Sequence, residues 1–212
     1  MKGLMLKDLY ILRKKGMLLL AVLAVYGVLS LTMGEASMVS FLSVMMAITL
    51  PMTSIAYDER GHFDTYACAL PVSRTAIVGA RYLMSLLFAL GGFAFSLLAG
   101  LGISLLRDNS SPLEVVLLTA AASLLVGLFY LSLLLPLLIW LGSEKARIAM
   151  IAVFVLPLGL LLLLTNGSSG LVDLVRQEPV QQALLLTVPT VVALLYPLSF
   201  LLSLRIYRKK EF

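Results

Sequence analysis

Charged residues and cysteine are both scarce in this sequence. Only 13% of its 212 residues are charged and 61% are hydrophobic, whereas about a quarter of the residues of a soluble domain are charged. So few polar residues cannot cover a water-facing surface, and the composition therefore predicts a membrane protein. The single cysteine, Cys68, cannot form an intramolecular disulfide. No secretory signal peptide is expected, because the apolar run after the basic start is long and lacks a small-residue cleavage site.

Several functional motifs are also missing. No charged residue lies deep within an apolar run, where ion-coupled carriers usually keep ionisable groups. The one histidine, His62, belongs to no His-Glu-x-x-His zinc motif, no intramembrane aspartate pair exists, and no G-x-x-x-x-G-K-[ST] phosphate loop is present. We therefore expect neither enzymatic activity nor a metal or cofactor in this chain. The net charge is +5. Because the basic residues lie beside apolar runs, interaction with lipid headgroups explains this charge better than binding of nucleic acid does.

The sequence does contain a series of long apolar runs. A membrane-spanning helix needs about 20 mostly apolar residues, and backbone polar groups in hydrocarbon must be paired within the segment. The alternating pattern of a transmembrane barrel is absent. We therefore predict an all-α, polytopic membrane protein with a single transmembrane domain over 1–212. Its six expected spanning helices are 16–33, 38–56, 76–106, 113–141, 148–165 and 180–204.

The distribution of Lys and Arg predicts the orientation. With six spans, all but two of the 16 basic residues lie on one side. The exceptions are Arg107 and Arg176. The positive-inside rule then places both termini in the cytoplasm. We therefore expect a multi-pass protein of the bacterial inner membrane. The segments on that side are the N-terminal arm, the loops 57–75 and 142–147, and the C-terminal tail.

Two segments outside the spans are open to alternative interpretations. Residues 1–15 place Met5, Leu9 and Leu12 on one helical face, which favours an amphipathic helix in the cytoplasmic interface. The alternative is an unstructured basic start. Residues 166–179, on the outer side, fit either a short amphipathic helix or a plain loop.

Small residues and prolines mark features inside the spans. A stripe of small residues at four-residue spacing lets another helix approach closely, either within the subunit or at a dimer interface. Prolines remove a helix hydrogen bond and bend the helix, which makes them candidate hinges or simply determinants of packing. The stripe is Gly92, Ser96, Gly100 and Ser104, and the prolines are Pro136, Pro157, Pro189 and Pro197.

The segment 57–75 is the densest polar cluster of the chain. Phe63, Tyr66 and Leu70 have helical spacing, which suggests a short amphipathic helix ending before Pro71. Ser73 or Thr75 is placed to cap the next span. Such a helix beneath the membrane would suit the receipt of force from a soluble partner, and a solvated loop is the alternative.

A family of bacterial ABC exporter permeases has a signature that resembles residues 57–83, YDERGHFDTYACALPVSRTAIVGARYL. Its elements are an acidic pair, a Leu-Pro-Val-Ser-Arg turn, and a Val and a basic-Tyr pair that open the third span. They match Asp58-Glu59, 70–74, Val78 and Arg81-Tyr82. The opening MKGLMLKDLY also resembles the family's amphipathic "elbow". The outer segment, 166–179, departs from the family because it is short and only weakly helical by pattern.

The resemblance implies a type-2 ABC exporter fold with two six-helix subunits, identical or related. It also implies two cytoplasmic ATPase subunits, which would bind ATP and Mg. A coupling helix at 60–70 would dock on the ATPase, and 142–147 would make a second contact. The coupling residues so implied are Asp58, Glu59, Arg60, Phe63, Tyr66, Leu70, Arg74, Glu144, Lys145 and Arg147. Relatives export amphipathic peptides such as phenol-soluble modulins, or confer immunity to antimicrobial peptides.

We therefore expect a permease subunit that exports a hydrophobic or amphipathic cargo, a peptide or a lipid-like molecule, through a cavity without charges. Two alternatives belong to other classes. One is a non-transport membrane protein that recruits a cytoplasmic partner through 57–75. The other is a secondary carrier, which the charge-free spans disfavour.

Overall fold

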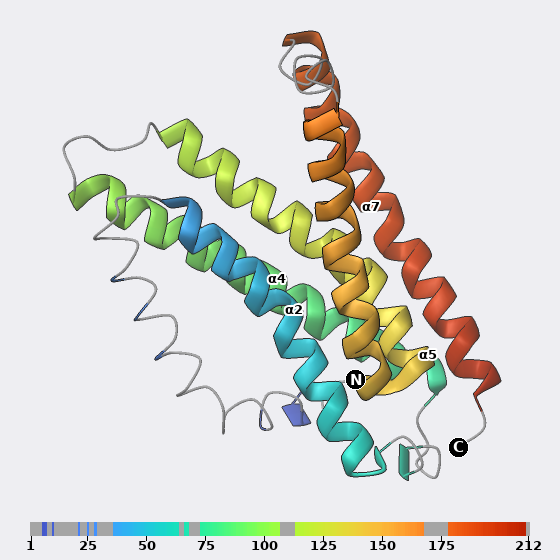
Figure 1. Ribbon diagram of the computed structural model, residues 1–212. Helices are drawn as coiled ribbons and strands as arrows, with labels where there is room; N and C mark the ends of the chain where they lie inside the picture. Colours follow the sequence, from blue (N-terminus) through green and yellow to red (C-terminus); the bar gives the residue numbers. More distant parts are fainter. Residues whose placement is uncertain are drawn as a thin grey trace.

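The computed structural model describes residues 6, 7, 10, 21, 25, 28, 36–63, 66, 67, 73–106, 113–167 and 178–210. The described part is built from helices (Figure 1), and no strand occurs among these residues. The four long helices are α2 (Ala36–Arg60), α4 (Arg74–Leu106), α5 (Leu113–Gly167) and α7 (Glu178–Lys209). The all-α prediction is therefore confirmed for the described residues.

Four helical stretches among the described residues are long and apolar enough to cross a membrane. They are Val39–Arg60, Arg74–Leu105, Leu113–Ala146 and Leu186–Lys209, and they correspond to the predicted second, third, fourth and sixth spans. The predicted fifth span, 148–165, lies in the last part of α5, which is helical to Gly167. The predicted first span, 16–33, lies outside the described residues except for positions 21, 25 and 28.

The helix α5 reverses its direction at a single glycine. Gly142 has φ 80° and ψ 170°, and it interrupts otherwise helical backbone. Figure 1 shows the chain running down to this point and back up beside α7. The segment 142–147 was predicted as a loop, and this is corrected. Only Gly142 leaves the helical conformation, because glycine alone adopts positive φ readily, and the next helix starts directly at Ser143.

The helix α2 extends four residues beyond the predicted end at position 56. Asp58 and Glu59 therefore lie in its last turn rather than in the loop that follows. Carboxylates near a helix C-terminus are unfavourable to the helix dipole, and both of these side chains have partners in other parts of the chain. Gly61 and His62 then form a turn, with His62 at φ 49°.

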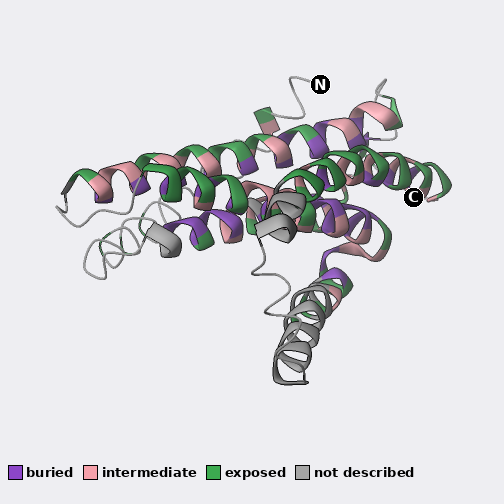
Figure 2. Cartoon of the chain, turned by 90° about the horizontal axis from the view of Figure 1, so that it is seen from above, coloured by how far each residue is buried: buried purple, intermediate pink, exposed green. Residues whose placement is uncertain are grey.

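The helices pack around α5, which contacts α2, α4 and α7. Buried apolar side chains include Val78 on α4, Leu131, Leu135 and Leu138 on α5, and Tyr207 on α7. Figure 2 shows that the buried positions lie on the sides of the helices that face one another. Large apolar side chains cover the outer surfaces, as expected where lipid is the solvent.

The cap of α4 and the helical backbone at the prolines of α7 can both be compared with the sequence predictions. The hydroxyl of Ser73 accepts the backbone N–H of Ala76 at 3.2 Å, so Ser73 is the N-cap. The helix α7 continues through Pro189 and Pro197, and Pro136 lies in helical backbone of α5. Of the predicted N-terminal helix 1–15, only positions 6, 7 and 10 are described, each helical, and 168–177 of the outer segment lies outside the described residues.

Candidate functional site at the polar end of the bundle

A buried carboxylate organises one end of the helix bundle. Asp58, at the end of α2, is 5% exposed and pairs with Lys7 and with Arg81 of α4. The Arg81 guanidinium lies 3.5 Å from the carboxylate. The two cations offset part of the cost of burying the Asp58 carboxylate. Asp58 therefore connects Lys7 and α4 to the end of α2.

Two aromatic rings complete this cluster. The Lys7 ammonium lies over the ring of Phe63, 3.6 Å from its centroid. The Arg81 guanidinium carbon lies 5.8 Å from the ring centroid of Tyr207, which is buried on α7. Cation–π contacts of this kind are worth about 0.5–2 kcal/mol, more where water is excluded. They extend the cluster from α2 and α4 to the turn after α2 and to α7.

Glu59 makes a second connection, from α2 to α5. Its two carboxylate oxygens lie 2.9 and 2.8 Å from the backbone nitrogen of Ser143, whose N–H they accept. Ser143 is the first helical residue after the kink, so the carboxylate lies at a helix N-terminus, where the dipole favours negative charge. A Cβ at Gly142 would lie 2.9 Å from a Glu59 oxygen. Glycine is thus required here both by φ and by the closeness of Glu59.

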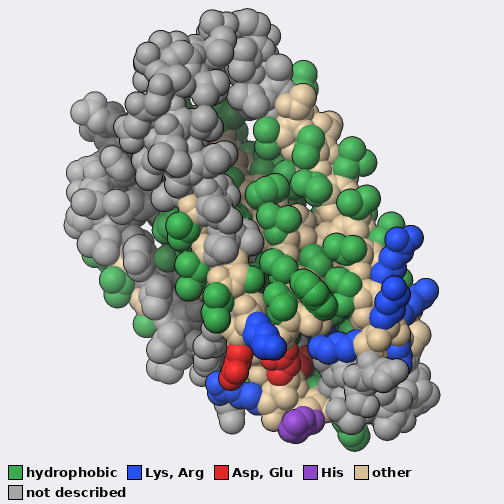
Figure 3. Space-filling model, turned by 45° about the vertical axis from the view of Figure 1, so that its right-hand side comes forward, with side chains coloured by type: hydrophobic (Ala, Val, Ile, Leu, Met, Phe, Trp, Pro, Cys, Tyr) green, Lys and Arg blue, Asp and Glu red, His purple; other side chains and the backbone are tan. Residues whose placement is uncertain are grey.

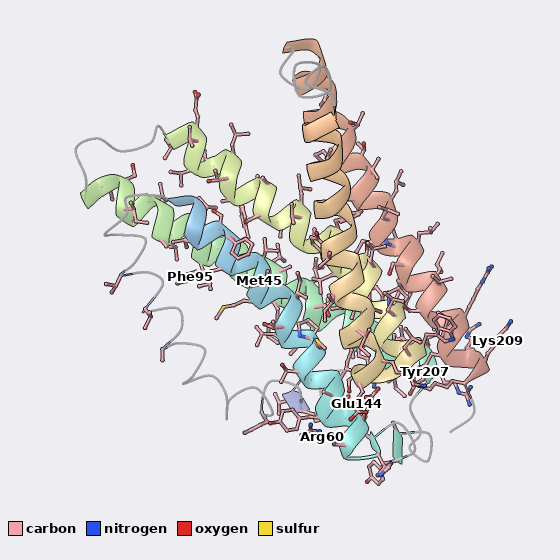
Figure 4. All side chains as sticks on the ribbon, in the orientation of Figure 1. Met45, Arg60, Phe95, Glu144, Tyr207 and Lys209 are labelled. Atoms are coloured by element: carbon pink, nitrogen blue, oxygen red, sulfur yellow. The ribbon has the colours of Figure 1, made fainter. Side chains whose placement is uncertain are left out.

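The remaining residues of the predicted coupling set are mostly exposed at this end. Arg60, Tyr66, Arg74, Glu144 and Lys145 are exposed, and Phe63 is half-buried. Figure 4 shows Arg60 and Glu144 at the same end of the bundle as Tyr207 and Lys209. Arg74 donates to the backbone carbonyl of Arg208 at 2.7 Å. Leu70 and the side chain of Arg147 lie outside the described residues.

The polar contacts at this end connect the helices to one another. Asp58, Glu59 and Arg74 are paired with other charged groups or with backbone. Among the described residues no group of three or more His, Cys, Asp or Glu side chains could hold a metal ion. Polar contacts join Lys7, α2, α4, α5 and α7 at this end, an arrangement that could transmit a displacement between the helices.

A tyrosine–serine cluster lies deeper in the bundle and was missed by the sequence reasoning. The Tyr82 hydroxyl lies 2.7 Å from the hydroxyls of both Ser199 and Ser203. The Tyr196 hydroxyl donates to the backbone carbonyl of Tyr82 at 2.8 Å. Ser199 in turn donates to the carbonyl of Ser132 on α5. Two serines four residues apart in an apolar span were the available signal, but nothing local identified Tyr82 as their partner.

The small-residue stripe of α4 faces α2. A Cβ on Gly92 would lie 3.0 Å from the backbone oxygen of Ser43, and the Ser96 hydroxyl lies 2.9 Å from that of Ser40. Ser43 also reaches Ser123 of α5 at 3.3 Å. At Gly92 and Ser96, therefore, the stripe forms a contact within the subunit. Gly100 is buried and Ser104 half-buried on the same helix.

A comparison with protein families matches residues 3–208 to the ABC-2 family transporter proteins. The chain belongs to this family. The match covers nearly the whole sequence and agrees with the resemblance seen in residues 57–83. A search of curated proteins found no match, and a search of solved structures found none.

Membership in the ABC-2 family identifies the chain as a multi-pass membrane component of a transporter. Such components have no nucleotide-binding domain of their own, consistent with the missing phosphate loop. ABC-2 permeases generally work with a cytoplasmic ATPase. The exposed residues at the polar end are therefore of interest as a surface for such a partner.

Proposed function

We propose that this ABC-2 chain is the membrane-spanning subunit of an exporter in the bacterial cytoplasmic membrane. Two such subunits, identical or related, would work with two copies of a separate ATPase that binds ATP and Mg. The segment 60–70 would be the coupling helix, and the turn at 142–147 the second contact. ATP-driven closure of the ATPases would move these segments and so change the access of a cavity between the subunits.

The contact between Glu59 and Ser143 carries this proposal. It joins the base of the candidate coupling helix directly to the second turn, with two oxygens on one N–H at 2.9 and 2.8 Å. A charged hydrogen bond of this kind is roughly twice as strong as a neutral one. Force applied at either segment would therefore reach α2 and α5 together.

The surface around this contact has the character of a docking site. Tyr66 is 65% exposed, and its backbone N–H reaches the His62 carbonyl at 3.2 Å, as in a helical turn. Arg60, Glu144 and Lys145 are also exposed and carry charges of both signs. Exposed aromatic and Arg side chains are enriched among the residues that anchor interfaces.

The positions of the helix ends support six crossings with both termini on one side. Lys7 contacts Asp58 in the last turn of α2, while α2 begins 22 residues earlier at Ala36, about 33 Å away along the helix. At the other terminus, Lys210 donates to the carbonyl of Ile139, at 3.2 Å, near the same end. Basic residues gather there (Figure 3), so the positive-inside rule assigns this end to the cytoplasm.

The cargo we propose is an amphipathic peptide, such as a phenol-soluble modulin or an antimicrobial peptide. The described parts of the spans carry hydroxyls and apolar groups but few charges. A cavity with such walls would bind an apolar face without leaving a buried charge unpaired. The resemblance of residues 57–83 to peptide-exporter permeases favours a peptide over a lipid-like molecule.

Co-purification with an ATPase tests the docking surface. The chain would be expressed with a phosphate-loop ATPase from a neighbouring reading frame, and the complex captured through the permease. We expect Tyr66→Asp to lower ATPase recovery at least tenfold, because a carboxylate would replace the exposed ring. Glu114→Lys is the matched control, since Glu114 is exposed in the first turn of α5, away from Gly142.

Equal recovery with Tyr66→Asp and with the control would contradict docking at 60–70. A protein that only recruits its partner would bind the ATPase but show no ATP-dependent flux. A secondary carrier would transport in response to an ion gradient without the ATPase. Either of the last two results would contradict the proposal that the chain is part of an exporter.

A further inference from the structure

A groove of about 710 Å³ lies between α5 and α7 in the half of the bundle nearest the polar end. This volume is within the roughly 300–1,000 Å³ of typical ligand sites. On α5 its walls include Leu133, Pro136 and Trp140, and on α7 they include Leu198, Leu202 and Arg205. Figure 3 shows the broad apolar surface on this side of the molecule, with Lys and Arg at its lower end.

The two serine hydroxyls on the wall of the groove, those of Ser132 and Ser199, already have partners. Ser199 donates to the carbonyl of Ser132 and lies 2.7 Å from the Tyr82 hydroxyl. An occupant therefore needs no hydrogen-bonding groups along most of its length. A flexible hydrocarbon chain meets this requirement, whereas an extended peptide would bring unpaired backbone N–H and C=O groups into an apolar site.

The end of the groove has a different chemistry. Arg205 is exposed, and no hydrogen bond or ion pair to it occurs within the described part of the chain. The Trp140 side chain, 65% exposed, lines the same groove. Tryptophan prefers the headgroup level of a bilayer, and basic pockets between membrane helices bind anionic headgroups.

We propose that this groove binds an anionic phospholipid, with an acyl chain along Leu198 and Leu202 and its phosphate at Arg205. The charge of the groove end selects an anion, and the apolar walls select a chain attached to it. This inference goes beyond the exporter function and does not rest on it. The described lining of the groove belongs to α5 and α7, and lipid binding there requires neither an ATPase nor a cargo.

Lipid retention by the full chain tests the proposal. The protein would be reconstituted in vesicles of equal amounts of phosphatidylcholine and phosphatidylglycerol, extracted in mild detergent, and its retained lipids quantified by mass spectrometry. We expect phosphatidylglycerol to be enriched. Arg205→Gln should lower the enrichment about fivefold, because one basic residue contributes about that factor to binding an anionic surface.

Lys209→Gln is the matched control for charge. Lys209 is exposed one turn further along α7 and is not among the described residues that line the groove, so its loss should change the enrichment less than twofold. Equal losses with Arg205→Gln and Lys209→Gln would reduce the effect to general surface charge and overturn the proposal. Absence of enrichment in the unmodified protein would overturn it as well.

A second pair of variants tests the apolar walls. Leu198→Trp should fill the groove and displace both lipids, whereas Leu194→Trp, on exposed α7 surface outside the described lining, should not. Unchanged retention with Leu198→Trp would contradict the assigned location. Arg205→Gln alters only an exposed side chain, so the proposal stays testable if the tryptophan variant fails to fold.

Two competitors distinguish the source of the anion and the class of occupant. Glycerol phosphate has the charge but no chain, and an excess of it should leave the enrichment unchanged. Displacement by it would indicate a free-anion site instead. Displacement of the retained lipid by an amphipathic peptide would assign the groove to cargo. Either result would overturn the proposal.

Discussion

The carboxylate of Glu59 holds the backbone N–H of Ser143 between its two oxygens, at 2.9 and 2.8 Å. The contact joins the last turn of α2 to the helix that starts after Gly142. Two segments that are far apart in the sequence are thus directly connected.

Glu59→Ala should destabilise the protein by about 1.5–3 kcal/mol, the usual contribution of a hydrogen bond to a charged group. Glu59→Gln keeps an acceptor oxygen but loses the interaction of the charge with the helix dipole, about 0.3–1 kcal/mol. Glu59→Gln should therefore destabilise the protein less than Glu59→Ala does. The free energy of unfolding would be measured from the fluorescence of Trp140, the only tryptophan. Glu144→Ala, at an exposed neighbouring position, should have little effect, and an equal effect there would contradict the assignment.

Gly142→Ala should destabilise the protein by at least about 1–2 kcal/mol. A Cβ disfavours the φ of 80°, and it would meet a Glu59 oxygen at 2.9 Å. Gly102→Ala is the control, because Gly102 is helical with nothing within 4 Å of a Cβ. It should be neutral or stabilising by about 0.5–1 kcal/mol. The same behaviour of both variants in thermal unfolding would show that the turn does not require glycine.

Adjacent glycines of α4 should respond in opposite ways to a large side chain. A Cβ at Gly92 lies 3.0 Å from the Ser43 backbone oxygen, whereas Gly91 has nothing within 4 Å. Gly92→Leu should therefore separate α2 from α4 and lower folded yield at least severalfold, while Gly91→Leu should be tolerated. Size-exclusion profiles of the two variants provide the comparison. Tolerance of Gly92→Leu would mean that the stripe does not form this contact.

Tyr82 and Ser203 should be energetically coupled. Tyr82→Phe removes a hydroxyl that lies 2.7 Å from those of Ser199 and Ser203, and hydrogen bonds between membrane helices average about 0.6 kcal/mol. A double-mutant cycle of Tyr82→Phe and Ser203→Ala should give a coupling energy of about 0.5–1.5 kcal/mol. Strict additivity would show that the two hydroxyls do not interact.

Asp58→Asn should be among the most damaging single changes at the polar end. Arg81 is buried, and loss of its counter-charge from a buried pair costs about 3–5 kcal/mol. Adding Arg81→Gln to Asp58→Asn should restore part of the lost stability, because the uncompensated Arg81 charge is then gone. The free energies of unfolding of the two single variants and the double variant test this expectation. A double variant as unstable as the sum of the single ones would contradict the pairing.

Sequence periodicity and local chemistry predicted the elements of this protein well. Charge-free runs identified four spans that the structure describes as helices. Local hydrogen-bonding preference limited the cap of α4 to Ser73 or Thr75, and the structure has Ser73 there. These features depend on neighbours along the chain. The end of α2 was placed too early because Asp58 and Glu59 have the composition of a loop, while their partners lie elsewhere.

The connections within the site depend on distant residues, and sequence patterns could not supply them. Glu59 and Ser143 are 84 positions apart, and Tyr82 and Ser199 are 117 apart. Which side chain meets which follows from how the helices pack. The resemblance of residues 57–83 indicated that Asp58 and Glu59 matter. The structure adds that both act as partners inside the chain rather than as exposed groups.

The central claim is that a separate ATPase drives cargo through this permease, and uptake into inverted vesicles tests it most directly. Vesicles holding this chain and its ATPase would be supplied with a labelled amphipathic peptide and ATP. We predict peptide accumulation that requires both chains and ATP hydrolysis, and that falls at least severalfold with Glu59→Ala while ATPase binding is retained. Accumulation that proceeds without ATP, or an intact complex that hydrolyses ATP and moves no amphipathic peptide, would contradict the account.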